Sequence, residues 1–171
     1  MQRHLTRRAF GALTLSAAAA GIARAGSLAP PGGRPILTVS GRIGAVNKAD
    51  TAEFDRDMLE ALGLHTVVTT TPWHSGPVRF EGVRMDRLMQ AVEATGESVT
   101  AIALNDYTTD IPISDFRAFG TILALKRDGA YMAVRDKGPL FVIYPYDSSP
   151  ELKREMYFNR SAWQVARLIV R

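Results

Sequence analysis

Residues 64–71, LHTVVTTT, form a run rich in β-branched side chains. Such side chains keep more of their freedom on a pleated strand than in a helix, so the run predicts a buried β-strand. Pro72 ends this strand, and Trp73 and His74 follow it in a loop that also contains glycine and proline. We therefore expect a fold built around a sheet, with two large polar-tipped rings placed just beyond a strand end.

The other hydrophobic patterns predict a mixed α+β domain with more strand than helix, arranged as mixed sheets rather than regular βαβ units. Further strands are expected at residues 36–41, 98–107 and 139–147. Residues 120–138 are typical of a hairpin around an Asp-Gly turn.

Two helices are expected among these strands. The first covers residues 51–63, with Asp50 as its N-terminal cap and Gly63 as its stop. A short strand from residue 78 feeds the second helix, which Gly96 ends. In the closing segment, a helical turn or two and a loop precede side chains that we expect to pack on the core. These side chains are Trp163, Val165, Leu168 and Val170.

Residues 1–25 have the layout of a secretory signal peptide: basic residues, an apolar alanine-rich run, and a small-x-small cleavage site ending at Ala25. The alternative is an uncleaved amphipathic anchor helix. Residues 6–10, TRRAF, resemble a twin-arginine export signal, although the arginine pair also suits the general secretion route. We expect a periplasmic protein with a flexible or extended lead-in at residues 26–35 and a single domain at residues 36–171.

The charge balance depends on this N-terminal segment. Four of the 21 Lys and Arg residues lie in residues 1–25, which contain no acid, so 17 bases remain against 17 acids. The mature net charge is therefore near zero, and the high isoelectric point does not indicate a nucleic-acid partner. The sequence contains no cysteine, which excludes disulfides and thiolate metal ligands.

Histidine, serine and glycine patterns argue against several common sites. His65 lies among apolar residues at a strand start, where a structural role is the more common one, whereas His74 lies in a loop. Two histidines without a third ligand at suitable spacing do not form a zinc site. No serine lies in a G-x-S-x-G elbow, and GRIGAVN lacks the helix pattern that a dinucleotide-binding turn needs.

Polar and aromatic residues at predicted strand ends and loops are the remaining candidates for a site. If they share one rim, they suit a flat polar heterocycle, which would stack on a ring, pair its edges with acids and give its oxygens to cations. A structural role is the alternative for each: RDKG at 135–138 is also a good solvated turn with an internal ion pair. The candidates are Trp73, His74, Asn105, Asp106, Tyr107, Arg135, Asp136, Lys137 and Arg160.

Four segments resemble, in the same order along the chain, the molybdopterin-binding oxidoreductase domain with the sulfite-oxidase fold. They are TPWHSGPVRFEGVRMDRLM, ALNDYTTDIPISDF, ILALKRDGAYMAVRDKGPLFVIYPYD and RSAWQVARLIV. The resemblance implies β-sheets with peripheral helices and a pterin pocket at the strand ends. It places Trp73 in the loop entering the pocket, residues 105–107 at the tip of the next strand, and residues 135–139 in a glycine-containing loop facing the cofactor.

The sequence departs from this family at one chemically important position. Catalytic members bind molybdenum through a cysteine thiolate near the end of the strand that leads to the pocket, where this chain has Thr69, Thr70 and Thr71. A threonine hydroxyl stays protonated near neutral pH and is a poor ligand for the metal. The resemblance therefore implies a pterin site in which bound molybdenum is not expected.

Small exported chains of this kind resemble periplasmic pterin-binding proteins that report to membrane signalling proteins, including enzymes of cyclic-di-GMP turnover. The first hypothesis is a non-catalytic sensor of a reduced pterin or a molybdopterin-like ligand. Two alternatives stay open. One is a molybdopterin-dependent oxidoreductase whose metal is held by the cofactor alone or with an oxygen ligand, and the other is a structural interaction protein on the same fold.

Overall fold

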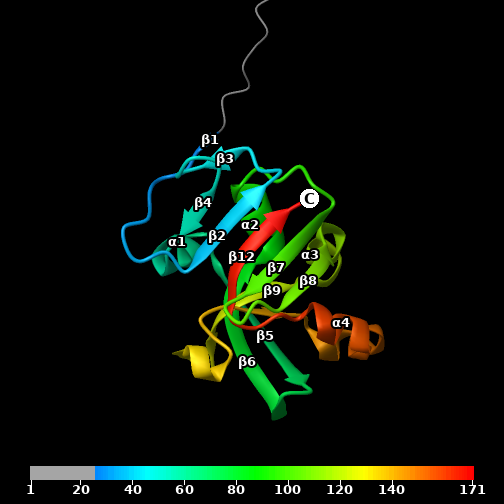
Figure 1. Ribbon diagram of the computed structural model, residues 1–171. Coiled ribbons are helices and arrows are strands. Elements are labelled where there is room, and N and C mark those ends of the chain that lie inside the picture. The colour runs from blue at the N-terminus through cyan, green and yellow to red at the C-terminus, as the bar shows by residue number, and fades with distance from the viewer. Residues whose placement is uncertain (1–25) are drawn as a thin grey trace, which may run out of the picture.

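The computed structural model describes residues 26–171, in which two five-stranded sheets carry four short α-helices (Figure 1). The predicted export signal, residues 1–25, lies outside the described residues. The predicted α+β class agrees with this architecture, although of the two sheets predicted as mixed the first is wholly antiparallel. Within residues 26–171, no helix is long and apolar enough to cross a membrane.

The first sheet is built on the hairpin of β5 (Leu64–Thr71) and β6 (His74–Arg84), which extends away from the rest of the molecule in Figure 1. The predicted strand over residues 64–71 is confirmed. β6 starts at His74 rather than at residue 78, because its first residue already pairs with Thr71 across the two-residue turn. β6 also pairs with β9 (Ile122–Arg127), and β10 (Ala130–Tyr131) and β11 (Phe141–Ile143) pair with β9.

The second sheet has the order β4-β2-β12-β7-β8. Its members are β4 (Ala52–Phe54), β2 (Leu37–Gly41), β12 (Val165–Val170), β7 (Ser98–Ala103) and β8 (Thr108–Pro112). The central strand β12 is parallel to β2 and antiparallel to β7, so the sheet is mixed, as predicted. In the lead-in, β1 (Gly26–Ser27) pairs in parallel with β3 (Ala45–Val46).

The first predicted helix is shorter than expected. α1 covers Arg56–Ala61 rather than residues 51–63, because Ala52–Phe54 pairs with β2 as β4. Asp55, not Asp50, is the cap: its carboxylate accepts the N–H of Met58. Gly63 follows the helix in the left-handed region (φ 95°), which glycine adopts without strain.

The other helical segments are short. They are α2 (Met85–Ala91), α3 (Ile113–Phe119), α4 (Glu155–Arg160) and three 3-10 turns, η1 (Val134–Asp136), η2 (Tyr146–Ser148) and η3 (Pro150–Lys153). The predicted strand 98–107 ends at Ala103, and neither β8 nor α3 was expected after it. In the hairpin predicted over residues 120–138, the second arm is mostly irregular, because only Ala130–Tyr131 pairs with β9 before η1 begins.

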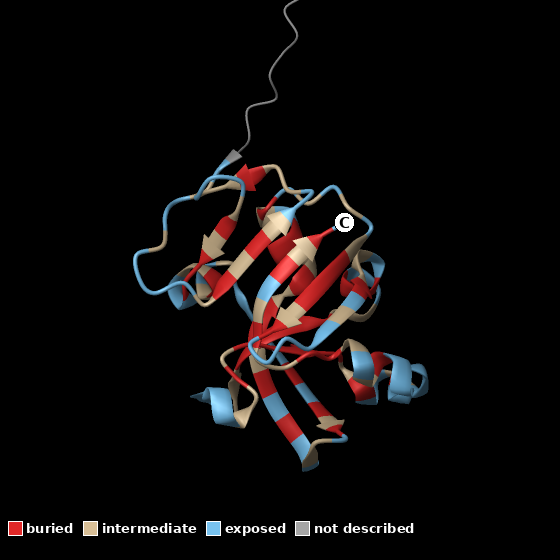
Figure 2. Cartoon of the chain, viewed as in Figure 1, coloured by how far each residue is buried: buried red, intermediate tan, exposed pale blue. Residues whose placement is uncertain are grey.

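Two hydrophobic clusters form the core. The larger one packs α2 and α3 against the second sheet, and the smaller one lies on one face of the first sheet. Buried and exposed residues alternate along β5 and β6 (Figure 2), which is the pattern of a sheet with one solvated face. Trp73 packs against both clusters, so the turn between β5 and β6 is anchored where they meet. Trp163, predicted to pack on the core, lies half-buried against the smaller one.

Candidate functional site

A cavity of about 380 Å³, which we call the aromatic cavity, opens beside the turn between β5 and β6. It brings together three of the predicted site residues, Trp73, Asn105 and Tyr107, from the β5–β6 turn and from the loop after β7. None of its lining side chains carries a charge. The complete lining is Pro72, Trp73, Asn105, Tyr107, Phe158, Asn159, Ser161 and Trp163.

Trp73 is both a wall of this cavity and part of an aromatic cluster. Its ring centroid lies 5.4 Å from that of Phe141, 5.6 Å from that of Trp163 and 6.1 Å from that of Phe158. The Trp163 and Phe158 contacts are edge-to-face, the arrangement that the charge distribution of aromatic rings favours. The indole of Trp73 is therefore held in one orientation by its neighbours.

Hydrogen bonds close the cavity on the side of the loop after β7. The Tyr107 hydroxyl donates to the backbone carbonyl of Asn159 at 2.8 Å, which ties the loop to α4. The side-chain oxygen of Asn105 accepts the N–H of Tyr107 at 3.2 Å. The amide nitrogen of Asn105 keeps its donors for a ligand.

Lys137, another predicted site residue, reaches the same region from η1. Its ammonium lies 4.0 Å from the centroid of the Trp163 ring, within the range of a cation–π contact. Burial, followed by the nearby Arg127, lowers the pKa of Lys137. One face of the Trp163 ring is therefore occupied by a residue of the protein, and a ligand must use the remaining edges and faces.

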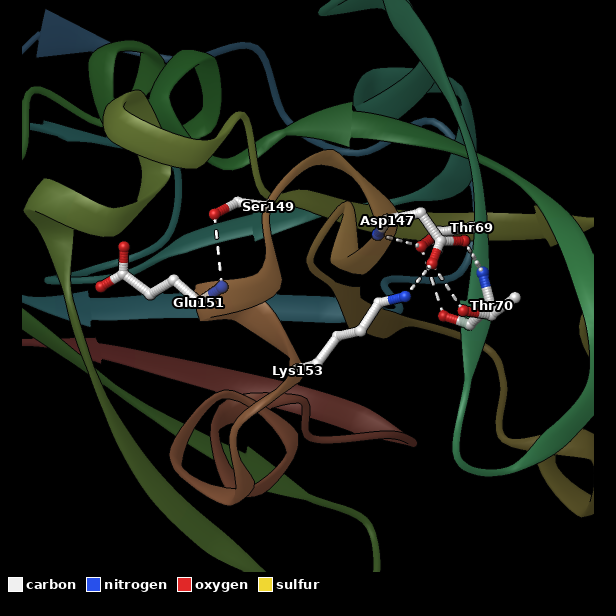
Figure 3. Close-up of polar contacts among 6 residues, drawn as sticks. All are labelled: Thr69, Thr70, Asp147, Ser149, Glu151 and Lys153. Atoms are coloured by element: carbon white, nitrogen blue, oxygen red, sulfur yellow. Dashed lines mark hydrogen bonds and ion pairs between the residues drawn. The ribbon is translucent and has the colours of Figure 1, made fainter.

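The threonines at the end of β5 make hydrogen bonds within the protein, as Figure 3 shows for the first two. Thr69 accepts the N–H of Asp147 at 3.1 Å, while the N–H and hydroxyl of Thr70 donate to the Asp147 carboxylate at 2.6 and 2.7 Å. Lys153 lies 2.7 Å from the same carboxylate. Lys153 and the Thr70 donors hold the pKa of Asp147 well below its usual range. These hydroxyls join β5 to η2.

The third threonine, Thr71, is joined to His74. Thr71 Oγ1 lies 2.9 Å from His74 Nδ1, and the other ring nitrogen, Nε2, lies 3.1 Å from the Arg127 guanidinium. Arginine can only donate, so Nε2 accepts and Nδ1 carries the proton that is donated to Thr71. Burial, then the charges of Arg127 and Lys137, lower the pKa of His74. His74 does not line the aromatic cavity; it positions the turn that carries Trp73.

The remaining predicted residues lie elsewhere. Arg160 donates to the buried carboxylate of Asp115 at 2.9 Å, and the Tyr144 hydroxyl donates to the same oxygen at 2.8 Å. Burial, followed by the hydrogen bond to Asp115, raises the pKa of Tyr144. The side chain of Arg135 is 88% exposed and lies 3.6 Å from Asp136 within η1, the solvated turn that was the alternative interpretation.

Asp106 faces away from the aromatic cavity and lines a second cavity on the other side of its loop. Its φ of 64° places it in the left-handed region, which aspartate tolerates better than most residues. Three lining residues, Phe158, Asn159 and Ser161, were not predicted from the sequence. Only Ser161 lies in a segment that carries the family resemblance. No sequence pattern indicated Asn159, and the only indication for Phe158 was an aromatic side chain close to that segment.

The donor groups of the site suit an uncharged flat ligand better than a metal ion. Within the described residues, no group of three or more His, Cys, Asp or Glu side chains is placed to hold a metal. Hard or soft metals need such carboxylate, imidazole or thiolate ligands. The aromatic walls and the amides of Asn105 and Asn159 are instead the groups that bind planar heterocycles.

No family model matches the chain, and no curated protein matches it. Among solved structures, the chain is similar to the sulfane dehydrogenase SoxCD from Paracoccus pantotrophus, with a TM-score of 0.57 and 14% sequence identity. The match covers 78% of this chain and 37% of the other, so the chain spans well under half the length of that protein. At this identity the likeness shows the fold alone: most of this chain shares the fold of part of that protein.

Proposed function

We propose that this protein binds a pterin in the aromatic cavity and has no catalytic activity of its own. The observation that carries the proposal is a cavity of about 380 Å³ with aromatic walls and amide edges but no charged side chain. Ligand pockets of this kind fix a small planar molecule by its faces and orient it by a few polar groups.

The aromatic cavity offers a pterin both kinds of contact. The rings of Trp73, Phe158 and Trp163 supply apolar surface for the bicyclic ring system. The pterin's amino group and ring N–H need acceptors, and its carbonyl needs a donor, which the amides of Asn105 and Asn159 can supply. Tyr107 then holds the loop over the ligand through its bond to α4.

The absence of charge in the lining favours a simple pterin over molybdopterin. Molybdopterin carries a phosphate, which protein sites bind with arginine, lysine or a row of backbone N–H groups. Of the cations expected to serve this purpose, Arg160 is paired with Asp115, Arg135 points into solvent and Lys137 lies over the Trp163 ring. A neutral pterin, reduced or oxidised, has no phosphate and does not need a cation at its site.

A second candidate function is supported by the structural comparison. The similar protein is named a dehydrogenase, so a molybdopterin-dependent oxidoreductase lacking the cysteine ligand is the alternative. Molybdenum, held by the cofactor's own dithiolene, would supply the redox chemistry. The chain's residues would then only bind the cofactor and exclude water, because the hydroxyls of Thr69, Thr70 and Thr71 are joined to Asp147 and His74.

The proposal extends to location and partner. The sequence of residues 1–25 favours export to the periplasm, by the twin-arginine or the general secretion route. A bound pterin there would be reported to a membrane signalling protein, as in the proteins that the sequence resembles. This part of the proposal is supported by the sequence resemblance.

The deciding experiment is native purification of the exported protein, followed by elemental analysis for molybdenum and fluorescence of the released ligand. The proposal expects a fluorescent pterin after oxidation and no stoichiometric molybdenum. Stoichiometric molybdenum would establish the oxidoreductase alternative, and neither signal would favour an interaction protein.

A titration with a simple pterin and its dihydro form locates the site. Asn105→Ala should weaken binding by about 1 kcal/mol, the usual contribution of one hydrogen bond. Asp106→Asn is the matched control, since it changes the neighbouring residue, tolerates the left-handed backbone and lines the other cavity. Equal loss in both variants would contradict the assignment of the site.

A further inference from the structure

A second cavity, of about 820 Å³, lies on the other side of the loop after β7. We call it the arginine cavity, because Arg34, Arg56 and Arg167 line it. These residues come from three separate places: the segment before β2, the start of α1, and the central strand β12. The fold therefore gathers three arginine residues around one cavity.

The three guanidinium groups are available to a ligand. Within residues 26–171, none of them lies within ion-pair distance of a carboxylate. Arg56 lies 4.0 Å from the centroid of the exposed Tyr131 ring, a stacking contact that orients the group and leaves its N–H donors unused. Guanidinium groups bind carboxylate and phosphate through paired N–H donors.

Three acidic side chains, Asp55, Asp57 and Asp106, share this lining, and none of them forms an ion pair with its arginines. Asp55 is buried and accepts the N–H groups of Gly33 at 2.7 Å and Met58 at 2.9 Å. These bonds lower the pKa of Asp55 and commit its carboxylate to capping α1. The lining therefore has no excess of formal charge, but its three arginines keep N–H donors that no carboxylate accepts.

The arginine cavity also has an apolar wall. Leu104 is 54% exposed and Val134 is 50% exposed, and both line it. Large aliphatic side chains in such a position leave apolar surface in water, which a ligand with a hydrocarbon body would cover. The wall and the cations together define the chemistry of the ligand.

We infer that the arginine cavity binds an amphipathic organic anion, with a carboxylate or phosphate head against the arginines and an apolar body against Leu104 and Val134. This inference concerns a different cavity from the pterin site and does not rest on the proposed function. The two cavities share the loop after β7: Leu104 and Asp106 line this one, whereas Asn105 and Tyr107 line the other.

The test uses the full chain as exported and four probes measured by calorimetry below their micelle concentrations: octanoate, octyl phosphate, octanol and octylammonium. We expect saturable binding of at least one anion, roughly tenfold tighter than octanol, because charge-assisted hydrogen bonds add to the apolar contact. The tighter of the two anions identifies the head group as carboxylate or phosphate. Equal affinity for octanol, or no saturation with either anion, would overturn the inference.

Variants then locate the binding. The double variant Arg34→Gln with Arg167→Gln should weaken anion binding roughly tenfold or more, and Leu104→Ser should weaken it through the apolar body. Arg42→Gln is the matched control, because Arg42 is also exposed but does not line the cavity. Urea midpoints of all variants check that they fold.

Tryptophan fluorescence distinguishes a ligand in the aromatic cavity from one in the arginine cavity. Both tryptophans of the sequence, Trp73 and Trp163, line the aromatic cavity, and neither lines the arginine cavity. Anion affinity should be unchanged in Trp73→Phe. Anion binding that survives the arginine variants but is lost in Trp73→Phe would move the ligand to the aromatic cavity and sink the inference.

Discussion

The two cavities on either side of the loop after β7 have opposite chemistry. The aromatic cavity has ring walls and no charged lining residue, whereas the arginine cavity has three guanidinium groups and exposed aliphatic side chains. The loop that separates them sends successive residues to opposite sides: Leu104 and Asp106 to one, Asn105 and Tyr107 to the other. Adjacent positions in this turn therefore do not belong to one site.

This difference separates the aromatic rings from the cations, which the sequence suggested would form a single site; we call this separation the division. Rings and cations were expected to surround one ligand together, with cations at 135, 137 and 160. The structure keeps the rings together but turns Lys137 onto Trp163, pairs Arg160 with Asp115 and leaves Arg135 in solvent. The arginines that do share a cavity are others, and two of them, Arg34 and Arg56, come from segments with no family resemblance.

Arg160 gives the largest expected effect, and it tests whether this residue stabilises the fold rather than binding a ligand in the aromatic cavity. Arg160→Ala leaves the Asp115 carboxylate buried with only the Tyr144 hydroxyl as a side-chain partner. Breaking one side of a buried ion pair costs about 3–5 kcal/mol, so we expect a loss of that size in the free energy of unfolding. Urea denaturation measures it.

Arg135→Ala is the matched control, since that side chain is 88% exposed and its contact with Asp136 is 3.6 Å long. Exposed pairs of this kind contribute little, and we expect no measurable change. If instead Arg160→Ala folds normally and loses pterin affinity, Arg160 serves the aromatic cavity and the division is wrong.

Trp73 tests whether the walls of the aromatic cavity are also structural. Because Trp73 packs against both hydrophobic clusters, Trp73→Ala should reduce the free energy of unfolding by about 3 kcal/mol, the lower end for large aromatic truncations. Trp73→Phe should retain most of the stability. Thermal denaturation of the two variants gives the comparison, and a stable Trp73→Ala variant would mean that the ring serves the ligand alone.

His74 makes the free energy of unfolding depend on pH. Its pKa is lowered in the folded protein by burial and by Arg127, so between that pKa and the unfolded value near 6.5 the unfolded chain binds a proton that the folded chain does not. Stability is therefore full above pH 6.5 and falls as the pH drops below it. Urea midpoints from pH 7.5 to 5.5 should show this slope, and His74→Gln should flatten it, while His65→Gln should not.

The sequence predicted the parts of the fold that depend on local periodicity. The run at residues 64–71 became β5 at its predicted bounds, because β-branched residues allow few alternatives. Residues 51–54 gave a helical pattern as well, yet Ala52–Phe54 pairs with β2. Strand pairing of a few residues depends on distant partners, which local patterns do not contain.

The candidate site was predictable to a smaller extent. Trp73, Asn105 and Tyr107 could be selected because they lie at the ends of predicted strands, and all three line one cavity. Arg160 could not be separated from ligand-binding cations, because its partner Asp115 lies 45 residues earlier in a helix that the sequence did not predict. Charge alone does not tell a buried partner from a bound ligand.

Tyr107 is expected to have the smallest effect on stability and the most informative effect on binding. Tyr107→Phe removes the 2.8 Å hydrogen bond to the Asn159 carbonyl. Because this bond is exposed to solvent, the free energy of unfolding should fall by at most about 1 kcal/mol. The bond nevertheless holds the loop that both cavities share. We expect the affinities for a pterin and for octanoate to fall together, by similar factors, in parallel titrations. A loss confined to the pterin would show that the two cavities are independent in energy as well as opposite in chemistry.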